Sequence, residues 1–423
     1  MRKTSLLVIF LTVFIDLIGF GIVLPLLPIY TRNFNASETV VGVIVASYSL
    51  MQFIFAPIWG RFSDRIGRRP ILLVSTAGAA VSYAIFAIGS GYGGTTGLLI
   101  LLGSRVLAGI CGANITVAQA YIADITPAEH RSKRMGLIGM AFGLGFVFGP
   151  PLGAVTLHYF GIAGPGWTAA ALCAANFVLM LVILGESWQR GATPVTPRPH
   201  FAQWAHTLRQ PKVGFVIGIF FLATFCFTCF EVTLGWLVGD NFHLDKARLE
   251  DAKTSGYLLM YCGIVGAVVQ GGAIGRLVKK LGEPRLIALS LVIFACSLGP
   301  LPFIHGDVSL GWGVLLRPEG HPWVLLLLFL GLLAIGSSLT RPPVFGLISI
   351  LTPAHEQGAT LGVAQSAGSL ARIVGPIVAG ACYQFRPAAP YVLCASISLM
   401  TAVLAWYWLC HRQVGIPAGA TTG

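Results

Sequence analysis

The feature that most constrains this chain is a series of long apolar segments separated by short polar connections. Each segment is close to the ~20 residues that a helix needs to cross ~30 Å of hydrocarbon. Glycine and proline occur inside the segments, which membrane helices tolerate. The sequence therefore predicts an all-α membrane protein with twelve transmembrane helices. The segments lie at 5–29, 40–59, 71–90, 97–124, 135–158, 166–185, 213–239, 256–275, 286–305, 322–350, 358–383 and 389–411.

The composition argues against a soluble protein. Of 423 residues, 56% are hydrophobic and 10% are charged, and the mean hydropathy is +0.81, whereas about 25% of the residues of a soluble domain are charged. The net charge of +12 raises the question of nucleic acid. The basic residues lie between apolar segments and form no single basic surface, so we expect a lipid bilayer and a small-molecule substrate as partners, and no nucleic acid.

The distribution of Lys and Arg predicts the orientation in the membrane. Eighteen of them fall in connections on the side of the N-terminus, and six fall on the other side. Cytoplasmic connections carry the excess of basic residues. We therefore expect a multi-pass protein of the cell (inner) membrane with both termini in the cytoplasm.

An internal repeat divides the chain into two pseudo-symmetric six-helix bundles. We expect bundles at 1–185 and 212–423, with a cytoplasmic linker at 186–211. Two halves related as a parallel repeat are the build of one class of secondary transporter, whose substrate site lies between the halves near the midplane. The repeat pairs Gly60–Gly67 with Gly275–Gly282, Thr126-Pro127 with Thr352-Pro353, and Gly149-Pro150 with Gly375-Pro376.

The connection between the second and third segments carries the most specific motif. Its glycines allow a tight turn and a close helix approach. Here the chain resembles the major facilitator superfamily, whose signature is G-x-x-x-D-[RK]-x-G-[RK]-[RK]. The resemblance implies that the carboxylate of Asp64 caps the positive N-terminal end of a helix in the other half, for which we expect the eleventh. The matching residues are Gly60, Asp64, Arg65, Gly67, Arg68 and Arg69.

The resemblance implies that this connection is a conformational gate. Arg68 is expected to pair with Asp124 at the inner end of the fourth segment. Such contacts hold the inner side shut in one state and break in the other, as alternating access requires. In the second copy Lys279 replaces the acid, so we expect only the first copy to act as a gate.

Further motifs resemble the drug:proton antiporter branch of this superfamily. Asp16, followed by Gly19, Gly21, Pro25 and Pro28, is similar to its helix-1 pattern, and Arg105 to Gly112 is similar to the helix-4 motif associated with proton coupling. Glycines at such spacing let helices pack closely, and a proline bends a span. The residues similar to the helix-5 antiporter motif are Gly145, Gly149, Pro150 and Gly153.

Within the branch, residues 40–153 are most similar to tetracycline-efflux and multidrug proteins. Tetracycline exporters typically carry further acidic residues in helices 3 and 9 and a histidine in helix 8. The corresponding stretches, around Ser82, Cys296 and Gly266, are uncharged. This difference argues against tetracycline itself as the substrate.

Ionisable residues inside the apolar segments are functional candidates, because burying them in hydrocarbon is costly. They are Asp16, Arg105, Glu231, Arg341 and Arg372, and the resemblance places the first four on cavity-lining helices. Asp16 and Glu231 occupy equivalent places in the two halves. We expect Asp16 or Glu231 to carry the proton, with Arg105 as the modulating partner, and Arg372 to be a static charge.

The substrate cavity is expected to be lined by polar and aromatic side chains of the same helices. Arg105, Thr116 and Gln119 fall on one helical face, and Glu231 shares a face with Phe227 and Thr228. Gln52 is equally suited to contact substrate or to form an interhelical hydrogen bond. The full expected set is Tyr48, Gln52, Thr116, Gln119, Phe227, Thr228 and Arg341.

The sequence thus predicts a proton-coupled antiporter that exports small amphipathic organic compounds. A proton symporter, or an exporter of a dedicated metabolite such as a siderophore, is the related alternative, and a non-transporting receptor or scaffold is the alternative of another class. No metal-protease, nucleophile-elbow or phosphate-loop motif indicates an enzyme. We expect no metal or cofactor beyond the proton, and a functional monomer.

Overall fold

The structure is a computed structural model that describes residues 2–23, 38–112, 114–187, 200–244, 250–306, 317 and 320–411. These ranges are almost entirely helical and contain no strand. Nine stretches within them are long and apolar enough to cross a membrane, and one, Thr254–Phe303, has 50 residues and is long enough to cross twice. With α1 and α3, described below, they account for the twelve expected spans.

The first six spans form one bundle, in which α5 and α6 together form the fourth span. Pro25 and Pro28 lie outside the described residues. The helices are α1 (Arg2–Val23), α3 (Glu38–Ile66), α4 (Arg68–Ser90), α5 (Gly94–Cys111), α6 (Asn114–Asp124), α7 (Ala128–Phe160) and α8 (Gly164–Ile183).

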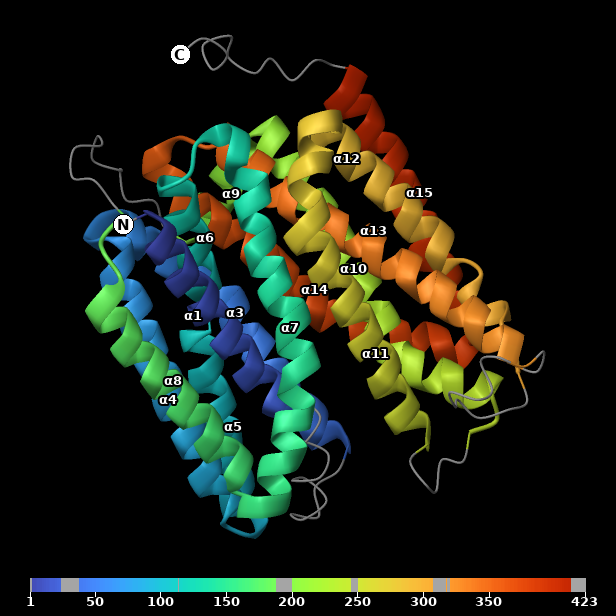
Figure 1. Ribbon diagram of the computed structural model, residues 1–423, viewed down its shortest axis with the longest axis horizontal. Helices are drawn as coiled ribbons and strands as arrows, with labels where there is room; N and C mark the ends of the chain where they lie inside the picture. Colours follow the sequence, from blue (N-terminus) through green and yellow to red (C-terminus); the bar gives the residue numbers. More distant parts are fainter. Residues whose placement is uncertain are drawn as a thin grey trace.

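The last six spans form the second bundle, which is preceded by the short helix α9 (His200–Arg209). Residues 188–199 of the expected linker lie outside the described ranges. The two bundles are seen side by side in Figure 1. The helices are α10 (Pro211–Asn241), α11 (Glu250–Val268) with η3 (Val269–Ala273), α12 (Ile274–Leu298), α13 (His321–Leu351), α14 (Gln357–Phe385), and α15 (Ala389–Ala405) with η7 (Trp406–His411).

The backbone confirms the internal repeat at two pairs of positions. Gly67 has φ 105° and ψ 162°, and its repeat partner Gly282 has φ 73° and ψ 160°. Both positive values of φ favour glycine, because a Cβ would be strained there. Pro127 (φ −57°, ψ 151°) and Pro353 (φ −58°, ψ 148°) likewise share one conformation and stand directly before helices. The two halves therefore use the same turns at equivalent places.

Two seams join the bundles. In the gate seam, α3 of the first half packs along α14 of the second. In the second seam, α7 of the first half packs against α11, α12 and α13. Hydrogen bonds cross both seams at the end of the molecule where α3 ends and α14 begins, which we call the gate end.

Candidate functional site: a gate between the halves and a charged midplane

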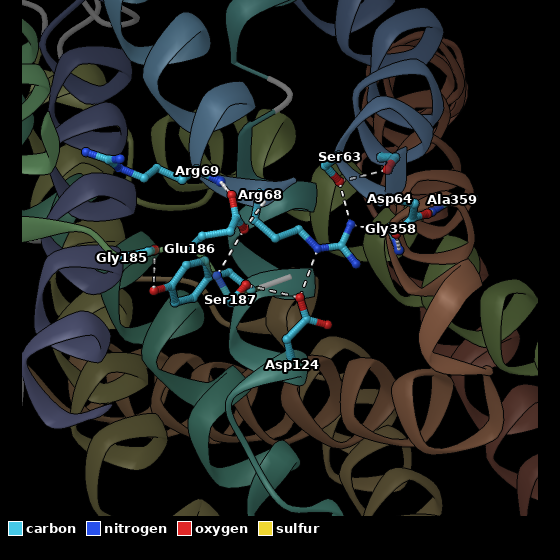
Figure 2. Close-up of polar contacts among 12 residues, drawn as sticks. Ser63, Asp64, Arg68, Arg69, Asp124, Gly185, Glu186, Ser187, Gly358 and Ala359 are labelled. Carbon is cyan, nitrogen blue, oxygen red and sulfur yellow. Dashed lines mark hydrogen bonds and ion pairs between the residues drawn. The ribbon is translucent and has the colours of Figure 1, made fainter. Parts of the chain in front are cut away.

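Asp64, in the last turn of α3, caps the first turn of α14. Its Oδ1 accepts a hydrogen bond from the backbone N–H of Gly358 at 2.9 Å, and its Oδ2 accepts one from Ala359 at 2.8 Å (Figure 2). The N-cap residue of α14, Glu356, makes no side-chain cap hydrogen bond. A carboxylate from the other half therefore satisfies the free N–H groups and the positive end of this helix. The predicted contact with the eleventh span is confirmed.

Glycines make this contact possible by bringing the two backbones together. A Cβ added to Gly60 would overlap the carbonyl oxygen of Gly358, and a Cβ on Gly358 would overlap that of Gly60. One turn further along α14, a Cβ on Gly362 would lie 2.6 Å from the Cα of Pro57. Larger residues at these positions would force α3 and α14 apart and move Asp64 away from its two donors.

Arg68, the first residue of α4, connects the gate to the rest of its own half. Its Nη1 lies 2.5 Å from Oδ1 of Asp64 and donates to Ser63 at 2.7 Å, and its Nε donates to Asp124 Oδ2 at 3.0 Å. The side chain is 1% exposed, and a charge so deeply buried requires charged partners. The predicted pairing of Arg68 with Asp124 is confirmed (Figure 2).

Sequence reasoning missed Glu186, which follows the sixth span. Its two carboxylate oxygens accept the backbone N–H groups of Arg68 at 2.9 Å and Arg69 at 3.1 Å, and so cap α4. Ser187 Oγ donates to Asp124 at 3.1 Å. The only sequence signal was an acid directly after an apolar span. Of the other motif residues, Arg65 is exposed and Arg69 donates to the carbonyl of Leu181 within its own half.

The second seam is joined differently at the gate end. Ser132 Oγ donates to Glu283 Oε1 at 3.0 Å, and Arg131 Nη1 donates to the carbonyl oxygen of Ser349 at 2.9 Å. Lys279, which stands where the first copy has Asp64, is exposed. The second copy therefore has no acid at the position of Asp64, whereas Glu283, at the position of Arg68, accepts a hydrogen bond from the other half. The expectation that only the first copy acts as a gate stays a prediction.

In the midplane of the first half, Asp16 of α1 accepts a hydrogen bond from the side-chain amide of Asn114 at the start of α6. The guanidinium of Arg105 lies over the rings of Tyr83 and Phe86, 5.2 Å and 4.9 Å from their centroids. Asn114 was missed, because the sequence pattern does not show which residue of the fourth span faces Asp16. The role of Arg105 as partner of the proton carrier stays a prediction.

Gln52 lies at the centre of a hydrogen-bond network that crosses between the halves. Its Nε2 donates to the hydroxyl of Tyr48 at 2.9 Å and to the carbonyl of Gly112 at 3.1 Å. Its Oε1 accepts from Nη2 of Arg372 in α14 at 3.1 Å, and the same nitrogen donates to Ser369 at 3.0 Å. Gln52 is only 4% exposed. This geometry favours the interhelical role for Gln52 in the conformation described.

Glu231 of α10 is half-buried, like its repeat partner Asp16. It lies near enough to Arg372 for the two charges to attract each other. Thr228 donates back to the carbonyl of Thr224 at 2.9 Å, and the ring of Phe227 lies 6.0 Å from that of Phe230.

Two further predicted cavity residues, Thr116 and Gln119 of α6, are completely or almost completely buried. Their Oγ1 and Oε1 atoms have no hydrogen-bond partner among the described residues. Arg341 of α13 lies at the second seam, with its guanidinium 4.2 Å from the ring centroid of Phe142 of α7.

The helix-5 motif forms the contact between α7 and α1. A Cβ on Gly145 would lie 2.7 Å from Leu17, one on Gly149 would lie 2.7 Å from Gly21, and one on Gly153 would lie 2.9 Å from the carbonyl oxygen of Ile22. Pro150 lies within α7, and its side chain is outside the described part. Close packing alone explains these glycines, so their link to antiport stays a prediction.

No group of three or more His, Cys, Asp or Glu side chains within the described ranges could hold a metal ion. The gate contacts join two rigid bundles at one end.

The sequence model of the Major Facilitator Superfamily matches residues 9–317. The class E tetracycline resistance protein of Escherichia coli is 32% identical, covering 89% of this chain and 87% of its own length. Multidrug resistance protein 2 of Bacillus subtilis (strain 168) is 27% identical, covering 96% of both chains. The crystal structure of the human organic anion transporter MFSD10 superposes with a TM-score of 0.79 at 23% identity, covering 96% of this chain and 99% of that one.

Proposed function

Because this chain belongs to the major facilitator superfamily, a family of membrane transporters, we propose that it is a proton-coupled antiporter that exports small amphipathic organic compounds by alternating access. One observation carries the proposal furthest. The acid that caps α14 belongs to the other half, at the gate end of the molecule. Such a cap stabilises the conformation in which the halves meet there and is lost when they part, which makes it a switch between two states.

The second element of the proposal is proton coupling through Asp16 and Glu231. The two acids sit at equivalent places in the two halves, and each is half-buried. Carboxylates in such places can take up a proton when the cavity faces one side of the membrane and release it when the surroundings change. Arg105 is proposed to modulate this exchange from the fourth span.

The cargo is proposed from the relatives. Two of them are named for resistance to tetracycline and to multiple drugs, and the human structure is of an organic anion transporter. We propose a drug-like amphipathic cargo for this chain and a contribution to antibiotic resistance. A dedicated metabolite exporter is the alternative, and the uncharged stretches of the third, eighth and ninth spans argue against tetracycline itself.

We further propose that the protein lies in the inner membrane with both termini in the cytoplasm, so that the gate end faces the cytoplasm. The excess of Lys and Arg on that side supports this orientation. The protein is proposed to work as a monomer with the proton as its coupling ion and without a bound cofactor.

The test is transport in proteoliposomes across an imposed proton gradient. A cationic dye, a neutral drug and an aromatic carboxylate are offered, and accumulation is compared with and without the gradient. We expect the gradient to drive transport of at least one. Equal rates in both conditions for every compound would refute antiport, and accumulation in the direction of proton movement would show symport instead.

The carboxylate assignment is tested in the same assay. Asp16→Asn and Glu231→Gln are expected to keep exchange between equal concentrations and to lose gradient-driven accumulation. Glu129→Gln, at an exposed acid at the start of α7, is the matched control. If both midplane variants accumulate cargo like the control, neither acid carries the proton.

A further inference from the structure

Arg341 of α13 has hydrogen-bond donors that the described residues leave unused. Its Nε and Nη2 are buried and have no hydrogen-bond partner among the described residues. A guanidinium has five N–H donors in a planar fork that matches a carboxylate. By comparison, Nη2 of Arg372 donates to both Gln52 and Ser369. Leaving donors unsatisfied at such a depth is costly, which points to a ligand that uses them in another state.

The surroundings of Arg341 are aromatic. Its Cζ lies 4.2 Å from the ring centroid of Phe142, 5.7 Å from that of Phe220 and 5.8 Å from that of Phe345. The last two rings contact each other edge-to-face at 4.8 Å. Rings of this kind attract a cation through their faces, and they offer an apolar surface to the body of an amphipathic ligand.

The three rings do not belong to one rigid body. Phe220 and Phe345 lie on α10 and α13, in the same half as Arg341, whereas the nearest ring, Phe142, lies on α7 of the other half. A separation of the halves at the gate end would move Phe142 away with α7 and uncover the guanidinium, which the ring covers in the conformation described here.

Positive charge is also concentrated here. Arg372 lies close enough to Arg341 for the two charges to repel each other. The described residues provide Arg341 with no ion pair at hydrogen-bond distance. A bound anion would relieve this repulsion and satisfy the two unused donors at once.

We propose that Arg341 binds the carboxylate of an anionic aromatic cargo while the gate end is open, and that Phe142 covers the guanidinium and displaces the carboxylate when the gate end closes. The proposal rests on the proposed function, because it assumes transport between two states, and it names the cargo as an organic anion. Affinity for the anion is then high on the side where the gate opens and low on the other. An exporter needs this difference to release its cargo outside.

The test is equilibrium binding to the purified full-length protein, without a proton gradient. The probes are radiolabelled naphthaleneacetate and naphthaleneacetamide, which share one skeleton and differ in charge. The wild-type protein is expected to bind the carboxylate about tenfold more tightly than the amide, as a charge-assisted bidentate contact allows. Arg341→Gln should abolish this preference. The absence of a preference in the wild-type protein, or its survival in Arg341→Gln, would overturn the proposal.

Comparison of Arg341→Gln with Arg372→Gln separates this site from a general effect of positive charge. Arg372→Gln removes the same charge nearby, but Nη2 of Arg372 already donates to protein groups, so the preference for the carboxylate should largely remain in this variant. Equal losses in the two variants would mean that only the local charge matters and would overturn the assignment to Arg341. Size-exclusion profiles and melting temperatures establish that each variant is folded.

Phe142→Leu tests the covering ring. Leucine keeps most of the bulk without the π-face, so affinity for naphthaleneacetate should rise about three- to tenfold while that for naphthaleneacetamide stays the same. An equal change for both probes would overturn the displacing role of Phe142.

A lipid phosphate is the other possible source of an anion. The binding assay is therefore repeated in phosphatidylcholine nanodiscs with and without phosphatidylglycerol. Naphthaleneacetate binding should be independent of the anionic lipid. Competition by phosphatidylglycerol would assign Arg341 to a lipid headgroup and overturn the proposal. Failure of gradient-driven transport in proteoliposomes, with the binding preference intact, would refute antiport and leave the anion site standing.

Discussion

The sharpest prediction concerns Asp64→Asn, which removes the charge from the cap across the halves. In the wild-type protein both carboxylate oxygens accept backbone N–H groups of α14, at 2.9 Å and 2.8 Å. Asparagine keeps one accepting oxygen and turns an NH₂ group toward the second donor. The contacts of Arg68 change as well, but they lie within one half and therefore affect both conformations alike.

The magnitude follows from the two bonds that cross the seam. A hydrogen bond to a charged group contributes about 1.5–3 kcal/mol and a neutral one about 1 kcal/mol, and a charge at a partly buried helix N-terminus adds up to ~2 kcal/mol. The loss of one bond and the weakening of the other destabilise the closed gate by about 2–4 kcal/mol. This shifts the equilibrium toward the open gate by roughly 30-fold to nearly 1000-fold.

Hydrogen–deuterium exchange of the protein in nanodiscs measures this shift directly, because the two amides concerned belong to Gly358 and Ala359. Peptides that contain the start of α14 should exchange much faster in Asp64→Asn. Asp124→Asn is the control, since it removes an acid bonded to the same arginine without touching α14. Unchanged protection of α14 in Asp64→Asn, or an equal effect of the control, would refute the gate described here.

Three further predictions follow from the seams and caps. Gly60→Ala should prevent closure of the gate and abolish transport, because the added Cβ would overlap a carbonyl oxygen of α14. Gly380→Ala is the control and should transport normally, because nothing lies within 4 Å of a Cβ there. Equal transport by the two variants would contradict the close approach of α3 and α14. Gln52→Leu removes the hydrogen-bond acceptor of Arg372 and should favour the open gate by about 1–2 kcal/mol. The expected readout is faster hydrogen–deuterium exchange at the start of α14. Unaltered exchange would show that the Gln52–Arg372 hydrogen bond does not hold the halves together. Glu186→Gln should lower the free energy of unfolding by about 1 kcal/mol or less, because this exposed acid caps α4. A thermal melt measures this change. A large change in hydrogen–deuterium exchange at the start of α14 would show that the acid acts across the seam instead.

Much of the gate could be predicted from the sequence because its parts have strict local requirements. The turn at Gly67 needs a positive φ, and the close approach at Gly60 needs the absence of a side chain, so both leave glycines at fixed spacing. The acid between them, in a connection otherwise rich in basic residues, indicated a helix end as its partner. Lys279 stands at the position equivalent to Asp64 in the repeat and so showed that the second copy lacks that acid.

The midplane was less predictable, because hydrogen-bond partners there depend on how each helix is rotated against its neighbours. The spacing of residues along the fourth span does not show that Asn114 meets Asp16. In the same way, nothing local to Gln52 or Arg372 shows that they meet across the halves.

The replacement of Asp64 by Lys279 in the second copy of the motif has a mechanical consequence. One side of the closed end is held by a carboxylate against a helix dipole and two glycine backbones, and the other by the hydrogen bonds of Ser132 and Arg131. Two sets of contacts of unequal strength do not break at the same time when the halves are pulled apart. We therefore expect the bundles to separate obliquely, with the edge at α7 yielding first and the edge at α14 acting as the last hinge line.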